Sequence, residues 1–340
     1  MTVSTHASLT MGFNSALSPA RRTANERINP HPAVTDMAPD HKVRDGFVLG
    51  LAAYGLWGIF PIYFKALDAV PLVDIVAHRI VWSLFVLAAL VAMTRGWVRI
   101  GVALRDRQTL GLLTLTALLI SINWLFYVYA INSGHILAGS LGYYLNPLAN
   151  ILLGRFILKE HLSKLQWAAV AIAGAGIAVL AAGALSQLWI SLILCVSFAT
   201  YGLLRKIAAA DPIAGLSIET AILFPFALGW LVFGHAAGQP GFGTDRGEAL
   251  LLAAGGIVST TPLLMFTAAA RRLPYSTLGM LQFIAPTLQF MIAVWLYGEA
   301  FTLAHAIAFG AIWIALGLYS ASLLHSMRTA VGGGLGTAPR

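Results

Sequence analysis

The sequence predicts an all-α, polytopic membrane protein with ten transmembrane helices, arranged as two inverted repeats of five helices each. Three observations lead to this prediction. Hydrophobic residues make up 59% of the 340 residues and charged residues only 10%, whereas a soluble domain is about one quarter charged. Apolar stretches of about twenty residues, the length that spans a bilayer, recur along the chain. Pro147 and Glu160 recur as Pro286 and Glu299, both at an offset of 139 residues.

The expected helices follow the apolar stretches in order. They are predicted at residues 46–64, 72–93, 109–131, 138–158, 165–183, 186–204, 214–234, 249–270, 275–297 and 302–324. The break between the fifth and the sixth depends on Ala184 to Gln187 alone, within a run that is otherwise nearly continuous. Because the loss of this break would change the topology, the orientation needs separate support.

The distribution of basic residues supplies that support. If both termini are cytoplasmic, 18 of the 21 Lys and Arg residues fall in cytoplasmic tails and loops, Arg205 and Lys206 among them. Lys65 and Arg246 fall outside, and Arg79 lies within a helix. Cytoplasmic loops of membrane proteins are rich in Lys and Arg, so we expect a multi-pass membrane protein with both termini inside. The formal charge of +8 is then an orientation signal, and no nucleic-acid partner is expected.

Four regions follow from this pattern. Residues 1–45 are polar and lack the apolar core of a signal peptide, which predicts a disordered cytoplasmic tail. Met37, within this tail, would serve equally well as a start of translation. Residues 46–184 and 185–324 are the two five-helix repeats, and residues 325–340 form a second cytoplasmic tail.

The two copies of the internal repeat share similar types of residue at aligned positions more than identical residues. Residues 120–162 align with residues 259–301 without a gap but share only four identities, against about three expected by chance. Other pairs keep their character: Ser121/Thr260, Tyr127/Phe266, Tyr144/Phe283, Asn150/Gln289 and Phe156/Trp295. Five spans per half, an odd number, place the second copy upside down in the membrane. This is the inverted-repeat design of secondary transporters.

Several motifs along both halves resemble those of one transporter family. They are Gly55-Leu-Trp-Gly-Ile-Phe-Pro-Ile-Tyr-Phe-Lys65, His78-Arg79, Asn123-Trp124, Gly142-Tyr-Tyr-Leu-Asn-Pro147, Lys159-Glu160, Thr261-Pro262-Leu263, Leu281-Gln-Phe-Ile-Ala-Pro286 and Gly298-Glu299. Over about residues 46–324, the chain resembles the RarD group of the EamA family, within the drug/metabolite transporter superfamily. The resemblance implies ten helices in two inverted EamA repeats, and export of small metabolites or drugs.

Two polar stripes are expected to line a transport path. Tyr143, Asn146 and Asn150 lie at positions i, i+3 and i+7, which share one face of the fourth helix. Gln282 and Gln289 lie in the same way on the ninth helix. The two stripes would face each other across a central cavity between inverted repeats. The alternative is that these amides hold helices together, at roughly 0.6 kcal/mol each.

Pro147 and Pro286 lie inside the same two helices. A proline in a helix removes one backbone hydrogen bond and frees a carbonyl nearby. Each proline therefore produces either a kink that moves during gating or a fixed bend, and both interpretations stay open.

Arg79 and His78 are candidates for substrate binding in the second helix. An arginine at mid-helix costs about 2.5–3.5 kcal/mol on insertion scales, so its presence needs a reason. Asp74 and His78 are four residues apart, a spacing that could hold the imidazole in place. The alternatives are a self-contained structural ion pair, or a side chain that extends to the outer headgroups.

Glu219 is the candidate for a proton-coupling residue. Pro71 and Pro212 open the second and seventh helices, and aligning them places Glu219 opposite His78. Glu219 would then lie part-way into the membrane from the cytoplasmic side. Burial of a carboxyl group disfavours its charged form, so such a group suits the uptake and release of protons. The alternative is an ordinary polar residue near a helix start.

Aromatic residues inside the spans could recognise a substrate. Trp57, Trp124, Tyr127 and Tyr143 lie well within their helices, whereas Trp and Tyr usually gather at the membrane interfaces. Interior aromatic rings can stack on a planar or cationic ligand, although plain packing is the commoner role. Asn123, beside Trp124 in one of the motifs above, belongs to the same candidate set.

Glu160 and Glu299 are paired across the repeats but are expected on opposite faces of the membrane, so they cannot form a carboxylate dyad. Glu160 precedes Ser163-Lys-Leu-Gln166, a capping-box pattern at the start of the fifth helix. Thr302 could cap the tenth. Both glutamates are therefore interpreted as structural residues at hairpin turns.

The function predicted from these features is secondary active transport of a small organic solute by alternating access, with protons as a candidate coupling ion. A passive facilitator or channel is the alternative, and it would not require Glu219 or His78 to titrate. An enzyme is not expected, since no catalytic, nucleotide-binding or metal-ligand motif occurs. Neither a cofactor nor a metal is predicted. Substrate identity, transport direction, coupling ion and oligomeric state stay open.

Overall fold

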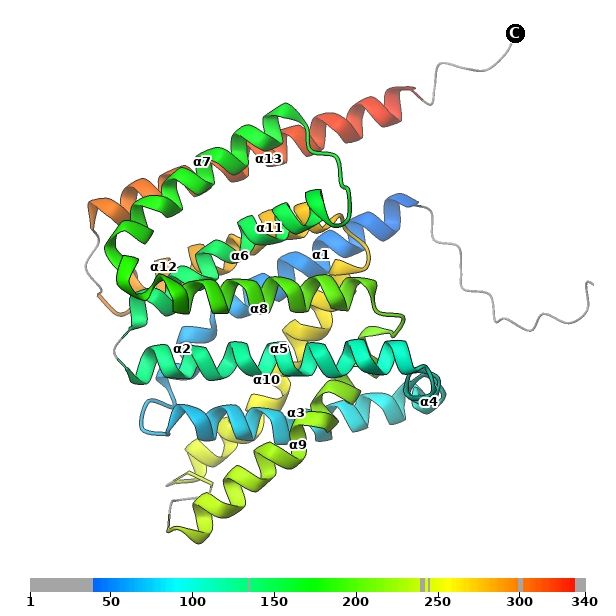
Figure 1. Cartoon of the computed structure of the whole chain (residues 1–340), viewed down its shortest axis with the longest axis vertical. Helices are drawn as coiled ribbons and strands as arrows, with labels where there is room; N and C mark the ends of the chain where they lie inside the picture. The colour runs from blue at the N-terminus through cyan, green and yellow to red at the C-terminus, as the bar shows by residue number, and fades with distance from the viewer. Residues whose placement is uncertain (1–38, 134, 239–241, 244, 299–301, 334–340) are drawn as a thin grey trace, which may run out of the picture. The chain divides into compact units, whose positions relative to one another are not determined.

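The computed structural model describes residues 39–133, 135–238, 242–243, 245–298 and 302–333. Figure 1 shows this part of the chain as helices laid side by side. The helices are α1 (Pro39–Gly58), α2 (Phe60–Lys65), α3 (Leu72–Met93), α4 (Trp97–Arg105), α5 (Arg107–Asn132), α6 (Ile136–Phe156), α7 (Lys164–Ala181), the 3-10 helix η2 (Ala182–Gln187), α8 (Leu188–Ile207), α9 (Pro212–Ala236), α10 (Arg246–Ala270), α11 (Tyr275–Gln282), α12 (Ile284–Trp295) and α13 (Leu303–Gly333). The all-helical prediction is confirmed for this part of the chain.

Nine segments in the described residues are helical, long enough and apolar enough to cross a membrane. This confirms a polytopic membrane protein. The remaining expected span coincides with α6, which has 21 residues but is not among the nine. Its sequence includes Asn146, Pro147 and Asn150, which lower its hydropathy. Ten spans therefore stay a prediction, because α6 has the length of a span but is not among these nine segments.

The helices extend beyond the apolar stretches at both ends of the described chain. The α1 helix begins at Pro39, so residues 39–45 are helical and not part of a disordered tail. The last helix continues to Gly333, past the expected end at residue 324. Hydropathy detects only the part of a helix that matches the bilayer, and intrahelical hydrogen bonds continue into polar sequence. Residues 1–38 and 334–340 lie outside the described residues.

Two predicted helices are each broken in two, and a proline explains each break. The first is divided into α1 and α2 around Ile59, where Pro61 has no N–H for the carbonyl of Trp57. The ninth is divided into α11 and α12 at Phe283, where Pro286 cannot bond to the carbonyl of Gln282. By contrast, α6 continues through Pro147 as one helix.

The centre of the fold is the contact between α6 and α11, one from each half of the chain, which Figure 1 shows side by side. Gly279 of α11 makes this approach possible, because a Cβ atom there would lie 2.7 Å from the carbonyl oxygen of Pro147. Around this pair, α13 packs on α7, while α3 packs against both α9 and α10. Gly256 brings α10 against α3, since a Cβ atom there would lie 2.6 Å from the backbone of Trp82.

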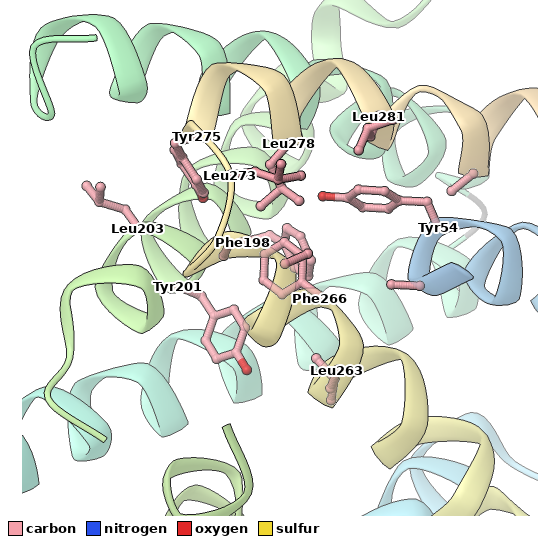
Figure 2. Close-up of a cluster of buried hydrophobic side chains, with 14 of the residues drawn as sticks. Tyr54, Phe198, Tyr201, Leu203, Leu263, Phe266, Leu273, Tyr275, Leu278 and Leu281 are labelled. Carbon is pink, nitrogen blue, oxygen red and sulfur yellow. The ribbon is translucent and has the colours of Figure 1, made fainter. Parts of the chain in front are cut away.

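A cluster of large aromatic side chains packs together between four of these helices. Figure 2 shows Tyr54, Phe198, Tyr201, Phe266 and Tyr275, from α1, α8, α10 and α11, gathered around a common centre. The ring centroids of Tyr54 and Phe266 are 6.2 Å apart, and those of Tyr201 and Phe266 are 6.4 Å apart. Aromatic pairs at such distances add about 0.5–1.5 kcal/mol beyond their buried area. The cluster therefore joins helices of both halves.

We expect Gly256→Ala to destabilise the fold by about 1–3 kcal/mol, because the added methyl group overlaps rigid backbone of α3. The measurement is thermal unfolding of the detergent-solubilised protein. Gly310→Ala in α13 is the matched control, since no atom of another helix in the described residues lies within 4 Å of the position of its Cβ. An equal effect of the two substitutions would contradict close packing of α3 and α10 at Gly256.

Candidate functional site

A cavity of about 600 Å³ lies among helices of both halves. Its wall includes most of the residues predicted to bind substrate: Arg79, Asn123, Trp124, Tyr127, Tyr143, Gln282 and Gln289, together with Pro286. Trp57, Phe60, Phe64, Phe198 and Phe290 complete a largely apolar and aromatic surface. Volume and lining are those of a typical small-molecule site, which is mostly apolar with a few placed polar groups.

Two amides in the cavity wall also hold helices together. Asn123 Nδ2 donates to the carbonyl oxygen of Leu194 at 2.9 Å and to Ser197 Oγ at 3.0 Å, which joins α5 to α8. Gln289 Nε2 donates at 3.0 Å to the carbonyl oxygen of Trp57, the group left free by Pro61. Freed backbone groups in membrane helices need such partners, because lipid offers none. These residues thus combine a structural role with their place in the wall.

Asn146 and Asn150 do not line the cavity, which corrects the predicted stripe on α6. Both are fully buried, and Asn150 Nδ2 donates to Gln282 Oε1 at 2.6 Å across the contact between α6 and α11. The helical spacing was right, but the close approach at Gly279 turns this face towards α11 and leaves only Tyr143 at the cavity. Both amide atoms of Asn146 are buried without a hydrogen-bond partner in this conformation.

Arg79 lies in the cavity wall with its guanidinium group enclosed by aromatic rings. Its Nε donates to Ser259 Oγ of α10 at 2.5 Å. The guanidinium carbon lies 5.8 Å, 5.6 Å and 5.3 Å from the ring centroids of Phe60, Phe64 and Trp124. No carboxylate in the described part of the chain lies within 4 Å of it. At 8% exposure, Arg79 is enclosed by protein and forms no ion pair within the described residues.

His78, one residue earlier, faces elsewhere. It is buried and is not one of the described residues that line the cavity. Its ring centroid lies 5.0 Å from that of Phe242, in the connection between α9 and α10. Asp74 Oδ1 accepts a hydrogen bond of 2.8 Å from the indole of Trp230. Consecutive residues of a helix point about 100° apart, and on α3 this step turns His78 away from the cavity wall that contains Arg79.

Glu219 is buried in an ion pair that sequence reasoning missed. Its Oε1 lies 3.4 Å from Nε of Arg205, and the two side chains are 2% and 0% exposed. Thr116 Oγ1 donates to Oε1 at 2.5 Å, and the Tyr201 hydroxyl donates to Oε2 at 3.4 Å. Arg205 was counted among cytoplasmic loop residues, yet it is enclosed beside Gly215, where a Cβ atom would overlap the guanidinium. The signal available in the sequence for its burial was its position just after Tyr201-Gly202-Leu203, at the end of an apolar helix.

A void of about 20 Å³ lies between Glu219 and the cavity. Ser259 and Thr260 border it, and the buried hydroxyl of Thr260 has no hydrogen-bond partner. The void shares Trp124 and Leu263 with the wall of the large cavity. Its walls are mostly apolar with a few polar groups, and its volume is about that of one water molecule.

Glu160 joins the two halves of the chain at the start of α11. Its Oε1 accepts from the backbone N–H of Tyr275 at 2.5 Å, and its Oε2 accepts from the backbone N–H and hydroxyl of Ser276 at 2.9 Å and 2.7 Å. The carboxylate therefore caps the start of α11, where a negative charge is favourable. Glu160 lies at a turn as expected, but its partners are in the other half. The capping box of Ser163 and Gln166 is confirmed, and Glu299 lies outside the described residues.

Metal binding has no support in the described residues, where no group of three or more His, Cys, Asp or Glu side chains could hold an ion.

Comparison with known proteins identifies the family. The model of the EamA-like transporter family matches residues 45–182. An uncharacterized transporter of Pseudomonas aeruginosa is 45% identical, over 84% of this chain and 96% of its own length. Protein RarD of Escherichia coli is 41% identical, over 84% and 97%. This chain belongs to the RarD group of the EamA-like transporter family. It is thus a multi-pass membrane transporter of a bacterial family.

Further comparisons agree with the EamA assignment. The chloramphenicol-sensitive protein RarD of Pseudomonas aeruginosa is 33% identical, over 80% of this chain and 92% of its own length. A crystal structure of another protein matches 82% of this chain and 96% of that chain with a TM-score of 0.64. The sequence identity to that protein is 22%, so the likeness concerns the fold alone.

We expect Arg205→Met to lower the free energy of unfolding by about 3–5 kcal/mol, because it leaves the carboxylate of Glu219 buried without a cation. Adding Glu219→Gln to Arg205→Met removes that charge and should recover much of the loss. Thermal unfolding in detergent measures both effects.

The control for this pair is Arg99→Met. It breaks an ion pair of 3.6 Å with Asp211 in which the side chains are 47% and 26% exposed, so a loss below about 1 kcal/mol is expected. Equal losses in the single Arg205 variant and in the double variant would show that the buried pair is not the source of the effect.

Proposed function

We propose that this protein is a secondary active transporter that exports small metabolites or drugs across the bacterial inner membrane by alternating access. The observation that carries the proposal is the cavity beside α6 and α11, lined from both halves of the chain. Substrate sites at the junction of two repeats are the rule in secondary transporters. The relative of Pseudomonas aeruginosa that is 45% identical is an uncharacterized transporter by name.

The proposed topology has ten spans in two inverted repeats of five, with α6 as the tenth and both termini in the cytoplasm. A central position explains why the polar residues Asn146 and Asn150 of α6 are fully buried. Its Asn150 bonds to Gln282 of α11, so its polar residues face protein instead of lipid. Polar side chains within membrane helices usually face the interior of the bundle.

Alternating access is supported by the difference between the two ends of the cavity. The wall reaches α2 at Phe60 and extends beyond α12 to Tyr297, at helix ends expected on the outer side. In this proposal the aromatic cluster of Figure 2 and the cap of Glu160 on α11 close the opposite end. A buried unpaired amide is unfavourable, and Asn146 is such a group. A second conformation could provide its partner.

Proton coupling through Glu219 is the proposed energy source. Its carboxyl group is buried beside Arg205, and the void lined by Ser259 and Thr260 separates it from the substrate cavity. One water molecule in that void would connect the two sites. A conformational change that separates Glu219 from Arg205 would favour protonation of the carboxyl, because a buried charge without a partner is disfavoured.

We expect Glu219→Gln to abolish the dependence of flux on an imposed pH gradient in proteoliposomes, since the amide cannot take up a proton. Downhill counterflow of a substrate should persist. Asp68→Asn is the control, because Asp68 forms an exposed pair with Lys65 at 3.0 Å. If flux through the unchanged protein does not respond to the pH gradient, the protein is a passive facilitator and the coupling proposal is wrong.

We expect Glu160→Ala to open the closed end by removing the cap on α11. The reporter is Ala293→Cys in the cavity wall, in a background where the single native cysteine is replaced by Cys195→Ser. In whole cells, modification of this position by a membrane-impermeant thiol reagent should slow severalfold when Glu160→Ala is added, as the population moves to the inward-facing state.

Glu160→Gln should have a smaller effect on the labelling rate, because the amide still presents one accepting oxygen to the start of α11. Identical labelling rates with and without Glu160→Ala would contradict a role of this contact in closing the inner end.

A further inference from the structure

The charge of Arg79 has no counter-charge in the described part of the cavity. We propose that Arg79 binds the carboxylate of the transported molecule, and that the substrates are organic acids with an apolar, planar body. This inference rests on the proposed function, because it specifies the chemical class that the same cavity would carry.

The charge balance of the cavity is the first step. Among the described lining residues, Arg79 is the only Lys, Arg, Asp or Glu side chain. Of the acids on the neighbouring helices, Glu219 is paired with Arg205 at 3.4 Å, and Asp74 accepts from Trp230 at 2.8 Å. The cavity therefore carries one fixed positive charge and no fixed negative one within this part of the chain.

The geometry of Arg79 is the second step. Ser259 takes the Nε hydrogen at 2.5 Å and so fixes the guanidinium plane. The two terminal nitrogens make no hydrogen bond within the described residues, and the side chain lines the cavity. An arginine with both terminal nitrogens free offers a fork of N–H donors that matches a carboxylate in two parallel hydrogen bonds.

The surroundings of the guanidinium define the rest of the ligand. Phe60, Phe64 and Trp124 enclose it at 5.3–5.8 Å. Farther along the wall, the rings of Tyr127 and Tyr143 lie 5.4 Å apart. Such a surface favours an apolar, planar body, while the charge excludes cations by repulsion. A small inorganic anion would leave most of the 600 Å³ cavity unfilled.

A purely structural role is the competing interpretation of Arg79. Its bond to Ser259 and its aromatic neighbours join α3 to α10, α2 and α5. That role would be served without two free terminal nitrogens at a cavity. An isolated charge in a membrane is strongly unfavourable, and a neutral side chain would join the same helices without this penalty. An anionic ligand explains why the residue at this position is charged, whereas packing between the helices does not.

The test uses three probes of nearly equal shape: 3-phenylpropionate, 3-phenylpropanamide and 3-phenylpropan-1-amine. Binding to the full chain in lipid nanodiscs is measured by calorimetry at neutral pH. The acid should bind at least ~10-fold more tightly than the amide, because charged hydrogen bonds are the stronger ones. The amine should bind more weakly than either. Sodium acetate and sodium chloride should compete only at far higher concentrations than the acid.

Two variants of Arg79 and a control variant test whether Arg79 causes the preference for the acid over the amide. Arg79→Gln should reduce the ratio of acid to amide affinity to about one, with binding of the amide retained, which also shows that the cavity is intact. Arg79→Lys keeps the charge but loses the fork, so an intermediate ratio is expected. Arg246→Gln, a basic residue at the start of α10 that does not line the cavity, should leave the ratio unchanged.

The inference is wrong if the acid binds no more tightly than the amide, if the preference survives Arg79→Gln, or if acetate and chloride compete as well as the acid. These outcomes are separate from failure of the proposed function. Flux without charge preference would overturn the inference alone. Selective binding of the acid without any flux would support the inference and overturn transport by this cavity.

Discussion

Polar groups inside this protein must find partners within the protein, because the lipid around an apolar helix offers neither donors nor acceptors. The rest of the structure depends on this constraint. Pro61 frees the carbonyl of Trp57, and Gln289 of the other half supplies the donor. Asn150 Nδ2 donates to Gln282 Oε1 across α6 and α11. The same few hydrogen bonds that satisfy buried groups therefore also hold the two halves of the chain together.

The constraint separates structural from functional polar residues. Arg205 and Glu219 neutralise each other in the interior, and Thr116 adds a further hydrogen bond to the carboxylate. Arg79 is different, since its charge meets only a hydroxyl group and aromatic rings. Asn146 is also different, because both of its amide atoms are buried and unpaired. Groups that the protein leaves incompletely satisfied are those that a ligand or a second conformation would complete.

The doubled proline and glutamate now have distinct roles. Pro286 accompanies a break between α11 and α12 and lines the cavity, whereas α6 passes through Pro147 without a break. Glu160 lies far along the chain from the residues it caps, at the start of α11. Glu160 therefore holds the two halves of the chain together at the start of α11, and Pro286 accompanies the break that follows α11.

The sequence by itself determined the helical class, the membrane location and most helix positions, because the bilayer thickness imposes an apolar length that is visible in any single stretch. It also determined that Arg79, Trp124 and Tyr143 are unusual for their depth. Only the tertiary structure decided which of these polar faces meets the cavity. Helical spacing places Asn146 and Asn150 on one face, but the glycine of α11 that covers this face is distant in sequence. The burial of Arg205 could not be predicted for the same reason. A charged residue near a helix end resembles a loop residue in the sequence, and its partner carboxylate, Glu219, lies on another helix.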